Sequence, residues 1–410
     1  MTLPLEGVVV ADYSQYVAGP VCTLLLADLG ADVIKVEPPH GDQWRRQEPC
    51  APDTSKPFIA LNRNKRSVVI DLKSADGRRD SRALIASADV VVHNCPPPRA
   101  ERFGLDRRSV LNANPRAVVV AISAFGSDGP DGGRAGYDLA AQAASGLLMA
   151  DSRIDDRVPV RAGGIAMTDF GAGMLAAVAA LAGLTGARET GIGCEVETSL
   201  LGAALTLQIQ RLVSVSDDHN PAEPLSDHAT PSDLAAVAAQ AALEHEINPY
   251  YRAYATADGF IAIACLNLAQ RQGLLEEFGL DDPAAGNPDD PPSSAAETWR
   301  RKRLTTAIAG ALADRATNEW IARLGSRRVP CQTVRTLSSM FASEQARANG
   351  LVQQINQPEL GIIDLLGSPF KLDGKALTAR RPAPSRGEHT EVVLETLSES
   401  GVAAGLETLP

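Results

Sequence analysis

One carboxylate in this sequence, Asp169, stands where a catalytic group could be held. The pair Gly163-Gly164 precedes it, and apolar residues follow it at helical spacing as far as Leu184. An aspartate at the start of a helix is a favoured cap, because its carboxylate accepts hydrogen bonds from the free N–H groups there. A carboxylate in a tight glycine-lined pocket can also act as a nucleophile, because such a pocket removes its hydration. The local sequence favours the helix cap and leaves the nucleophile as the alternative.

The composition predicts a soluble protein with two domains. The chain has 410 residues, which is more than one hydrophobic core usually serves. Its hydrophobic content of 44% and charged content of 22% are ordinary for globular proteins. The net charge of -11, with no long basic block, argues against a nucleic-acid partner. The N-terminus lacks the pattern of a secretion signal and we expect no stretch to span a membrane, so we predict a cytoplasmic protein.

Histidine and cysteine spacing indicates no metal site. The histidines form no H-x-x-x-H pair, and the cysteines form no C-x-x-C pair. The cysteines are scattered through apolar or strand-like segments, which favours free, buried thiols in a reducing compartment. These residues are Cys22, Cys50, Cys95, Cys194, Cys265 and Cys331.

The first 126 residues alternate between strand and helix patterns, which predicts a parallel sheet. A strand at Val8–Tyr13, a helix at Ala18–Leu29 and a strand at Val33–Val36 form a βαβ unit. Further strands are expected at 68–72, 90–93 and 118–122, with helices at 75–87 and 107–113. We predict an α/β fold with a doubly wound, mainly parallel, Rossmann-like sheet.

Motifs for nucleotide cofactors are missing from this predicted sheet. The first strand-to-helix turn, DYSQYVAGP, has no G-x-G-x-x-G pattern, and no G-x-x-x-x-G-K-[ST] occurs. A nicotinamide-dependent dehydrogenase and a P-loop enzyme are therefore excluded at the level of motifs.

A ligand of an open α/β sheet is expected beyond the carboxyl ends of the strands. Those ends fall at residues 14–18, 72–73, 93–95 and 123–126. Several cations lie near them and could together bind an anion, although each one alone is better explained as a solvated surface charge. They are Lys65, Arg66, Lys73, Arg99 and Arg102.

The second half of the chain predicts a smaller α+β domain. A helix is expected around Tyr137, and another at Leu200–Val213 ends the large domain, residues 1–213. The polar stretch 214–248 is interpreted as a linker, and residues 249–330 as the small domain. That domain opens with a hairpin at 251–265 and continues with helices at 269–278, 298–315 and 317–324, separated by a surface loop at 281–296. A helix at 338–348 and a hairpin around Pro358–Gly361 follow.

Ordered sequence blocks give the chain a family resemblance. They include AGPVCTLLLADLGADVIKVEPPHGD, LNRNKRSVVIDLKS, HNCPPPRAERFGLD, AGYDLAAQAASG, TDFGAGMLAAVAALAGL and LGSPFKL. The chain resembles the class III coenzyme A transferases, a group that includes formyl-CoA and carnitine CoA-transferases and the α-methylacyl-CoA racemases. The resemblance implies an interlocked homodimer, in which each subunit threads through a ring formed by the other. It also implies that residues 331–410 return to complete the large domain.

The resemblance implies that Asp169 is the nucleophile. The carboxylate would attack an acyl-CoA thioester to give an acyl anhydride, which becomes an aspartyl-CoA thioester that the acceptor acid opens. Coenzyme A would be a substrate, with no tightly bound cofactor. The residues that match the family's coenzyme A contacts are Val17, Ala18, Leu72, Lys73, Asn94, Cys95, Arg102, Phe103, Ala135, Tyr137 and Asp138.

Three positions bear on the alternatives. Val17 stands in the slot where some members have a glutamine that assists the acyl intermediate, and Pro38 stands where a basic residue is common. Tyr137 occupies the slot of the racemase histidine, and a tyrosine pKa near ~10 suits proton transfer poorly at neutral pH. A CoA-transferase is thus favoured, with an α-methylacyl-CoA racemase or epimerase and a non-catalytic CoA-binding paralogue as alternatives.

Overall fold

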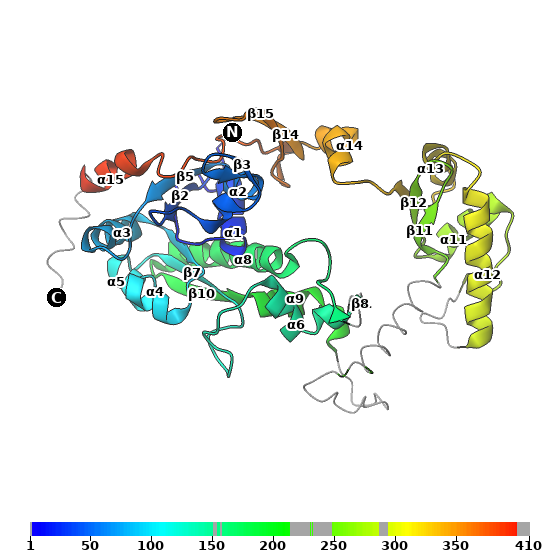
Figure 1. Ribbon diagram of the computed structural model, residues 1–410, viewed down its shortest axis with the longest axis horizontal. Coiled ribbons are helices and arrows are strands. Elements are labelled where there is room, and N and C mark those ends of the chain that lie inside the picture. Colours follow the sequence, from blue (N-terminus) through cyan, green and yellow to red (C-terminus); the bar gives the residue numbers. More distant parts are fainter. Residues whose placement is uncertain are drawn as a thin grey trace. The chain divides into compact units, whose positions relative to one another are not determined.

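The computed structural model describes residues 2–150, 154–155, 158–213, 230, 232, 248–286 and 294–399 (Figure 1). The chain divides into two compact units. Unit 1 comprises Met1–Asp151, Arg161–Asn220 and Ser343–Pro410, and unit 2 comprises Ser152–Val160 and Pro221–Ala342. The stretch 214–248, interpreted above as a linker, lies almost entirely outside the described residues.

Unit 1 is built on the parallel sheet that the alternating pattern predicts. Its six strands lie in the order β10-β7-β6-β1-β2-β5 and all pair in parallel. Most of the central strands are runs of buried valines, as expected where helices cover both faces of a sheet. The strands are β1 (Val9–Asp12), β2 (Asp32–Glu37), β5 (Lys65–Val69), β6 (Val90–His93), β7 (Val118–Ser123) and β10 (Cys194–Ser199).

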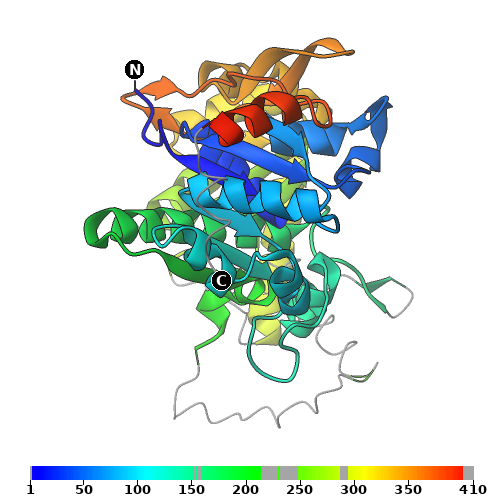
Figure 2. The ribbon, with the colours of Figure 1, turned by 90° about the vertical axis from the view of Figure 1, so that its left-hand side faces the viewer.

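Two hydrophobic clusters cover the two faces of this sheet, because successive side chains of a strand point to opposite sides. Val90 and Val92 of β6 pack with helices α1 (Ala18–Asp28), α8 (Met167–Thr190) and α9 (Leu200–Leu207). Val91 packs on the other face, with helices α3 (Ala75–Ser87), α4 (Pro97–Phe103), α5 (Arg107–Ala113) and α15 (Thr390–Glu399). Figure 2 shows α15, in red, near α3 and β5, although some 300 residues separate these elements in the sequence.

Short elements complete unit 1. Before the third strand of the sheet lie a single-turn helix η1 (Gln43–Arg46), strands β3 (Pro49–Ala51) and β4 (Thr54–Ser55), and helix α2 (Lys56–Asn62). Helices α6 (Asp138–Ala144) and α7 (Leu147–Ala150) precede α8, and η2 (Ile209–Arg211) follows α9. The C-terminal part adds α14 (Glu344–Ala348), β14 (Val352–Gln357), β15 (Gly361–Leu366), β16 (Lys371–Leu372) and β17 (Lys375–Ala376).

Unit 2 contains the predicted hairpin and helices. Strands β11 (Tyr251–Ala255), β12 (Phe260–Ala264) and β13 (Cys331–Thr333) form an antiparallel sheet. Its helices are α11 (Leu268–Phe278), α12 (Ala295–Leu312) and α13 (Thr317–Ser326), followed by η3 (Ser338–Ala342). Strands β8 (Ile154–Asp155) and β9 (Val158–Pro159) also belong to this unit.

Several element boundaries differ from the sequence-based expectation. The strand expected at 68–72 is β5, Lys65–Val69, because the polar residues at its start find partners inside the protein. The helix expected at 338–348 is two short helices, because Ser343 caps the start of α14 and interrupts the first. The helix expected at 200–213 ends at Leu207. Helix α12 begins at Ala295, where Ser294 caps it, rather than at 298.

Helix α8 corrects the expectation that no stretch could span a membrane. It has 24 residues, and its apolar window has a mean hydropathy of 1.7. By length and composition alone, such a helix could span a membrane. In unit 1 it instead packs against α1 and the sheet, and 44% of the apolar window is buried. Small residues allow the close packing, since a Cβ atom at Gly173 would lie 2.5 Å from the Ala18 carbonyl oxygen. We therefore interpret α8 as a core helix whose outer face is also apolar.

A buried histidine ends β6 and provides a test of this packing. His93 is 4% exposed, and neither ring nitrogen has a hydrogen-bond partner among the described residues. Burial lowers the pKa of His93 to about 4. The unfolded chain therefore takes up this proton near pH 6.5, before the folded protein does, and stability falls as the pH falls from 6.5 towards 4.

We predict that His93→Leu removes this loss. Between pH 7 and pH 5, the wild-type protein should lose about 2 kcal/mol more unfolding free energy than the variant, as measured by urea denaturation. His40→Gln, at an exposed histidine, is the control. Its unfolding free energy should depend on pH as that of the wild type does. Equal pH dependence of the wild type and His93→Leu would contradict the assignment of a neutral buried imidazole.

Candidate active site

Asp169 lies in the first turn of α8, as the sequence predicts, but it is not the helix cap. The helix begins at Met167, and the capping position is Ala166, whose side chain makes no capping hydrogen bond. The side chain of Asp169 is partly buried. The interpretation of Asp169 as an N-cap is therefore wrong, and its carboxylate is left without that role.

The cap of α8 comes from another helix. Asp138, the first residue of α6, accepts hydrogen bonds through Oδ1 from the Thr168 backbone N–H at 2.9 Å and from its hydroxyl at 2.8 Å. Its Oδ2 accepts a bond from Gln142 at 2.8 Å, and Gln142 in turn accepts one from the Ala162 N–H at 2.9 Å. All three polar side chains are buried. This network joins α6, the loop that contains Gly163 and Gly164, and the first turn of α8.

The same arrangement changes the acidity of Asp169. Burial, and then the negative charge of Asp138, raise its pKa to about 7. A carboxylate with a raised pKa is a stronger base than an exposed one, and it remains ionised in part of the molecules at neutral pH. Such a group is suited to attack an electrophilic carbon, and perturbed carboxylates of this kind concentrate at functional sites.

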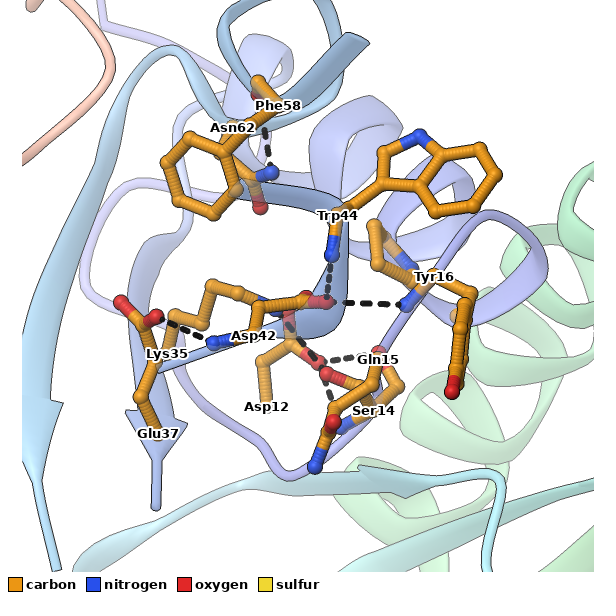
Figure 3. Close-up of polar contacts among 12 residues, drawn as sticks. Asp12, Ser14, Gln15, Tyr16, Lys35, Glu37, Asp42, Trp44, Phe58 and Asn62 are labelled. Carbon is orange, nitrogen blue, oxygen red and sulfur yellow. Dashed lines mark hydrogen bonds and ion pairs between the residues drawn. The ribbon is translucent and has the colours of Figure 1, made fainter. Parts of the chain in front are cut away.

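A cluster of buried charges lies under the loop between β1 and α1 (Figure 3). The Lys35 ammonium is fully buried, lies 2.8 Å from Asp42 Oδ2, and donates a hydrogen bond to the Ser14 carbonyl at 2.9 Å. Asp12 at the end of β1 accepts bonds from the Ser14 backbone and hydroxyl. Breaking one partner of such a pair leaves an uncompensated buried charge, which costs about 3–5 kcal/mol. The loop is therefore held in one conformation.

The anion-binding rim predicted from the sequence is only partly present. Lys65 is fully buried and donates to Thr23 at 2.7 Å and Asn62 at 2.9 Å, and burial lowers its pKa to about 8. Arg66 forms an ion pair with Asp32. Both residues belong to the sheet and its packing, because β5 starts three residues earlier than expected. The remaining cations, Lys73, Arg99 and Arg102, are exposed.

The residues that the resemblance assigns to coenzyme A follow the carboxyl ends of four parallel strands. Val17 and Ala18 are buried where α1 begins after β1, and Leu72 and Lys73 follow β5. Cys95 follows β6 and is partly exposed, as is Phe103 in α4, while Arg102 beside it is exposed. After β7, Ala135 and Tyr137 are exposed, the latter by 65%.

Two of these residues have their polar atoms engaged inside the protein. The Asn94 amide donates to the Gln15 carbonyl at 2.8 Å and accepts from the Gln15 N–H at 3.1 Å. Asp138 is occupied by Thr168 and Gln142, as described above. Their side chains therefore position neighbouring segments.

Sequence reasoning missed three residues that shape the site, namely Tyr16, Asp42 and Thr168. Thr168 had a signal, since a Thr-Asp pair before an apolar run is typical of a helix start. Asp42 follows a glycine, which suggests a turn but not its buried lysine partner. Tyr16 has a backbone φ of +69°, a conformation that is unusual for a bulky residue and costs about 1–3 kcal/mol. No pattern in the sequence marks it.

Known proteins share both the sequence pattern and this fold. Residues 5–390 match CoA-transferase family III. The chain is 30% identical over 394 residues to the succinyl-CoA:glutarate CoA-transferase of Mus musculus, covering 96% of this chain and 86% of that protein. It is 30% identical over 405 residues to the formyl-CoA:oxalate CoA-transferase of Streptomyces coelicolor, covering 95% and 94%. The crystal structure of a CAIB/BAIF family protein from Brucella suis superposes with a TM-score of 0.74 at 26% identity, covering 97% and 100%.

The raised pKa of Asp169 makes a prediction about stability. Above pH 7 the folded protein holds an ionised, partly buried carboxylate next to Asp138, which the unfolded chain ionises freely near pH 4. We predict that Asp169→Asn raises the unfolding free energy at pH 8 by on the order of 3 kcal/mol, allowing for partial exposure, and leaves it unchanged at pH 3.5. Denaturant unfolding at both pH values measures this.

The variant Asp138→Asn separates the effect of burial on the pKa of Asp169 from the effect of the Asp138 charge. Asp138→Asn keeps the shape of the side chain and removes its charge. In a protein that carries Asp138→Asn, Asp169→Asn should therefore raise the unfolding free energy at pH 8 by less than it does in the wild type. An equal gain in both backgrounds would show that Asp138 does not act on Asp169.

Proposed function

Because this chain belongs to CoA-transferase family III and is a CoA-transferase, we propose that it moves coenzyme A from an acyl-CoA to a carboxylic acid through covalent intermediates on Asp169. One observation carries this proposal: a single partly buried carboxylate with a raised pKa stands in the first turn of α8, held there by Asp138. Coenzyme A enters and leaves as part of the substrates, with no tightly bound cofactor.

The proposed reaction begins with attack by a carboxylate oxygen of Asp169 on the thioester carbon. The carbon–sulfur bond breaks, coenzyme A leaves as a thiolate, and a mixed anhydride remains on the enzyme. The thiolate then attacks the Asp169 carbonyl carbon, which forms an aspartyl-CoA thioester and releases the donor acid. The acceptor carboxylate repeats the two steps in reverse order, and Asp169 is regenerated with no net proton change.

The environment of Asp169 supports such a nucleophile. Burial removes part of its hydration, which strengthens its attack on an electrophile. The preceding loop gives the substrate room, since a Cβ atom at Gly164 would meet no other atom within 4 Å. The N–H groups of the first helical turn provide a positive potential for a developing oxyanion.

We propose that coenzyme A lies along the carboxyl edge of the sheet. Exposed cations suit its phosphates, and these are Lys73, Arg99 and Arg102. Val17, Ala18, Leu72, Cys95, Phe103 and Ala135 are proposed contacts for the rest of the molecule. Asn94 and Asp138 act by holding Gln15 and Thr168 in place.

The choice of transfer over α-proton chemistry rests on Tyr137 and on the relatives. Tyr137 stands where a racemase would need a histidine base, and the relatives named above are CoA-transferases for succinyl-CoA with glutarate and for formyl-CoA with oxalate. We propose that this chain likewise uses an acyl-CoA donor and a free carboxylate acceptor. Its free thiols are consistent with a cytoplasmic location.

Exposed apolar side chains of α8, α9 and η2 support the proposed homodimer. Contiguous exposed apolar patches on soluble proteins usually mark an interaction surface. We propose that a second copy of the chain covers this patch in an interlocked dimer. The patch residues are Met174, Leu175, Val178, Leu205, Leu207 and Ile209.

We predict that the Asp169 intermediate can be trapped. Incubation with succinyl-CoA and hydroxylamine should convert Asp169 to a hydroxamate, because hydroxylamine attacks the activated carbonyl, and peptide mass spectrometry would locate it. Asp169→Asn should lose transfer by at least about 1,000-fold while remaining folded. Asp131→Asn, at a surface carboxylate, is the control. Full transfer activity in Asp169→Asn would refute the covalent mechanism.

We predict that a charge on the apolar patch weakens the dimer. Val178, which is 66% exposed on α8, should be buried between subunits, and light scattering of the wild type should give the mass of two chains. Because interlocked subunits cannot separate while they stay folded, Val178→Glu should lower the melting temperature of the dimer, as measured by circular dichroism. Thr185→Glu, at an exposed polar position of the same helix, is the control. A monomeric wild-type protein would contradict the proposed dimer.

A further inference from the structure

A single buried glutamine joins the two chain segments that lead to the candidate nucleophile. Gln142, in α6, is fully buried, and its carboxamide makes a hydrogen bond at each end. Its oxygen accepts from the Ala162 backbone N–H at 2.9 Å, and its nitrogen donates to Asp138 Oδ2 at 2.8 Å. Ala162 lies in the loop before α8, and Asp138 holds Thr168, the residue before Asp169. One side chain therefore connects that loop to the group that caps the helix.

The partners of Gln142 fix the orientation of its carboxamide. A backbone N–H can only donate a hydrogen bond, so the atom of Gln142 that faces Ala162 has to be the oxygen. The nitrogen then faces Asp138, whose other oxygen accepts from the Thr168 N–H. A carboxylate accepts both bonds, whereas a proton on Oδ2 would meet a second donor. The network thus requires a group at position 142 that accepts at one end and donates at the other.

Few charged groups face this network. The helices that pack on α6 are α7, α8 and α9, and neither α7 nor α9 contains a titratable residue. In α8, Asp169 lies in the first turn, whereas Arg188 and Glu189 lie about 30 Å further along the helix. Arg161, which precedes Ala162, is exposed. The carboxylates of Asp138 and Asp169 are therefore the ionisable groups on these helices that bear on the carboxamide.

The network sets the direction in which Asp169 projects. Helix α8 has no cap of its own, so the bonds from Thr168 to Asp138 place its first turn. Gln142 holds Asp138 through its second oxygen and also holds the loop in which Gly163 adopts a φ of +61°. A displacement of about 1 Å between reacting groups can lower a rate by about 100-fold. Loss of the carboxamide would release both segments at once.

We propose that Gln142 is a positioning residue of the transfer reaction, and that its carboxamide holds the Ala162 loop and the Asp138 cap together so that the nucleophile meets the thioester in one geometry. This inference rests on the proposed function, because it concerns the attack by Asp169. The role belongs to kcat rather than to substrate binding, since the fully buried side chain does not touch the substrate.

The first test removes the carboxamide and keeps the length of the side chain. The thioether of methionine is at most a weak hydrogen-bond acceptor. With succinyl-CoA as the donor and glutarate as the acceptor, Gln142→Met should lower kcat by about tenfold or more. The KM for succinyl-CoA should change by less than about threefold, because the residue makes no contact with it.

Gln357→Met is the matched control. Gln357, at the end of β14 and outside the proposed site, is 4% exposed. Its carboxamide also makes a hydrogen bond at each end, donating to the Ala383 carbonyl at 2.9 Å and accepting from the Ala383 N–H at 3.1 Å. Gln357→Met should therefore lose stability as Gln142→Met does, and keep kcat within about twofold of the wild type.

The second test restores the network by protonation. Gln142→Glu keeps an oxygen that accepts from the Ala162 N–H, and its protonated form also donates to Asp138 Oδ2. Burial and the charge of Asp138 should raise the pKa of the introduced carboxyl group well above its usual range. Once ionised, this group can no longer donate and repels Asp138. The kcat of Gln142→Glu should thus lie within about threefold of the wild type at pH 6 and at least about tenfold below it at pH 9.

Two results would overturn the positioning role while leaving CoA transfer intact. One is a kcat of folded Gln142→Met equal to that of the wild type, since a purely structural glutamine would affect stability alone. The other is a kcat ratio of Gln142→Glu to the wild type that is equal at pH 6 and pH 9. Urea unfolding at both pH values shows that each variant is folded, and Gln357→Glu should give a ratio that does not vary with pH.

Failure of the proposed function has a different signature. If the wild type transfers coenzyme A from neither succinyl-CoA nor formyl-CoA to any acid, the proposed function and this inference are refuted together. If the wild type transfers coenzyme A and both Gln142 variants behave like their Gln357 controls, only the role of Gln142 is refuted.

Discussion

The hydrogen bonds from Thr168 to Asp138 are the contact on which the site depends. A carboxylate from α6 occupies the N-terminus of a 24-residue helix that supplies no cap of its own. This contact satisfies a backbone donor, sets the direction of the first turn, and places a negative charge near Asp169. One side chain thus helps to set both the position and the basicity of the candidate nucleophile, since burial raises the pKa of Asp169 first and the charge of Asp138 raises it further.

Buried charge plays a second, separate role under the β1–α1 loop. The ion pair of Lys35 and Asp42 is fully buried, and apolar side chains of similar size would often stabilise a fold as well or better. What an apolar pair cannot do is accept hydrogen bonds from Tyr16 and Trp44 while holding the Ser14 carbonyl. We interpret the pair as specifying one loop conformation, in which Tyr16 is kept at its unfavourable positive φ.

Helix α8 connects the two parts of the site. Its small residues, such as Gly173, allow α1 to approach closely, so the Tyr16 loop and the Asp169 turn are brought together by the same packing. Its outer face stays apolar and exposed in the single chain. The inner face packs on α1 and the sheet, and the proposed dimer would cover the outer face, so such a helix is apolar all round. Its length and composition therefore match those of a membrane-spanning helix.

The sequence by itself determined the order of strands and helices, the parallel sheet and the first-turn position of Asp169, because periodicity and turn residues act between neighbours along the chain. It placed β5 three residues late and took Lys65 for a surface cation, since the partners of a buried lysine are distant in sequence. Only the tertiary structure decided that Asp138, some 30 residues before α8, caps that helix, and that Tyr16 adopts a positive φ. The physical reason is that a hydrogen bond or ion pair between segments depends on how the chain folds back, which local pattern does not encode.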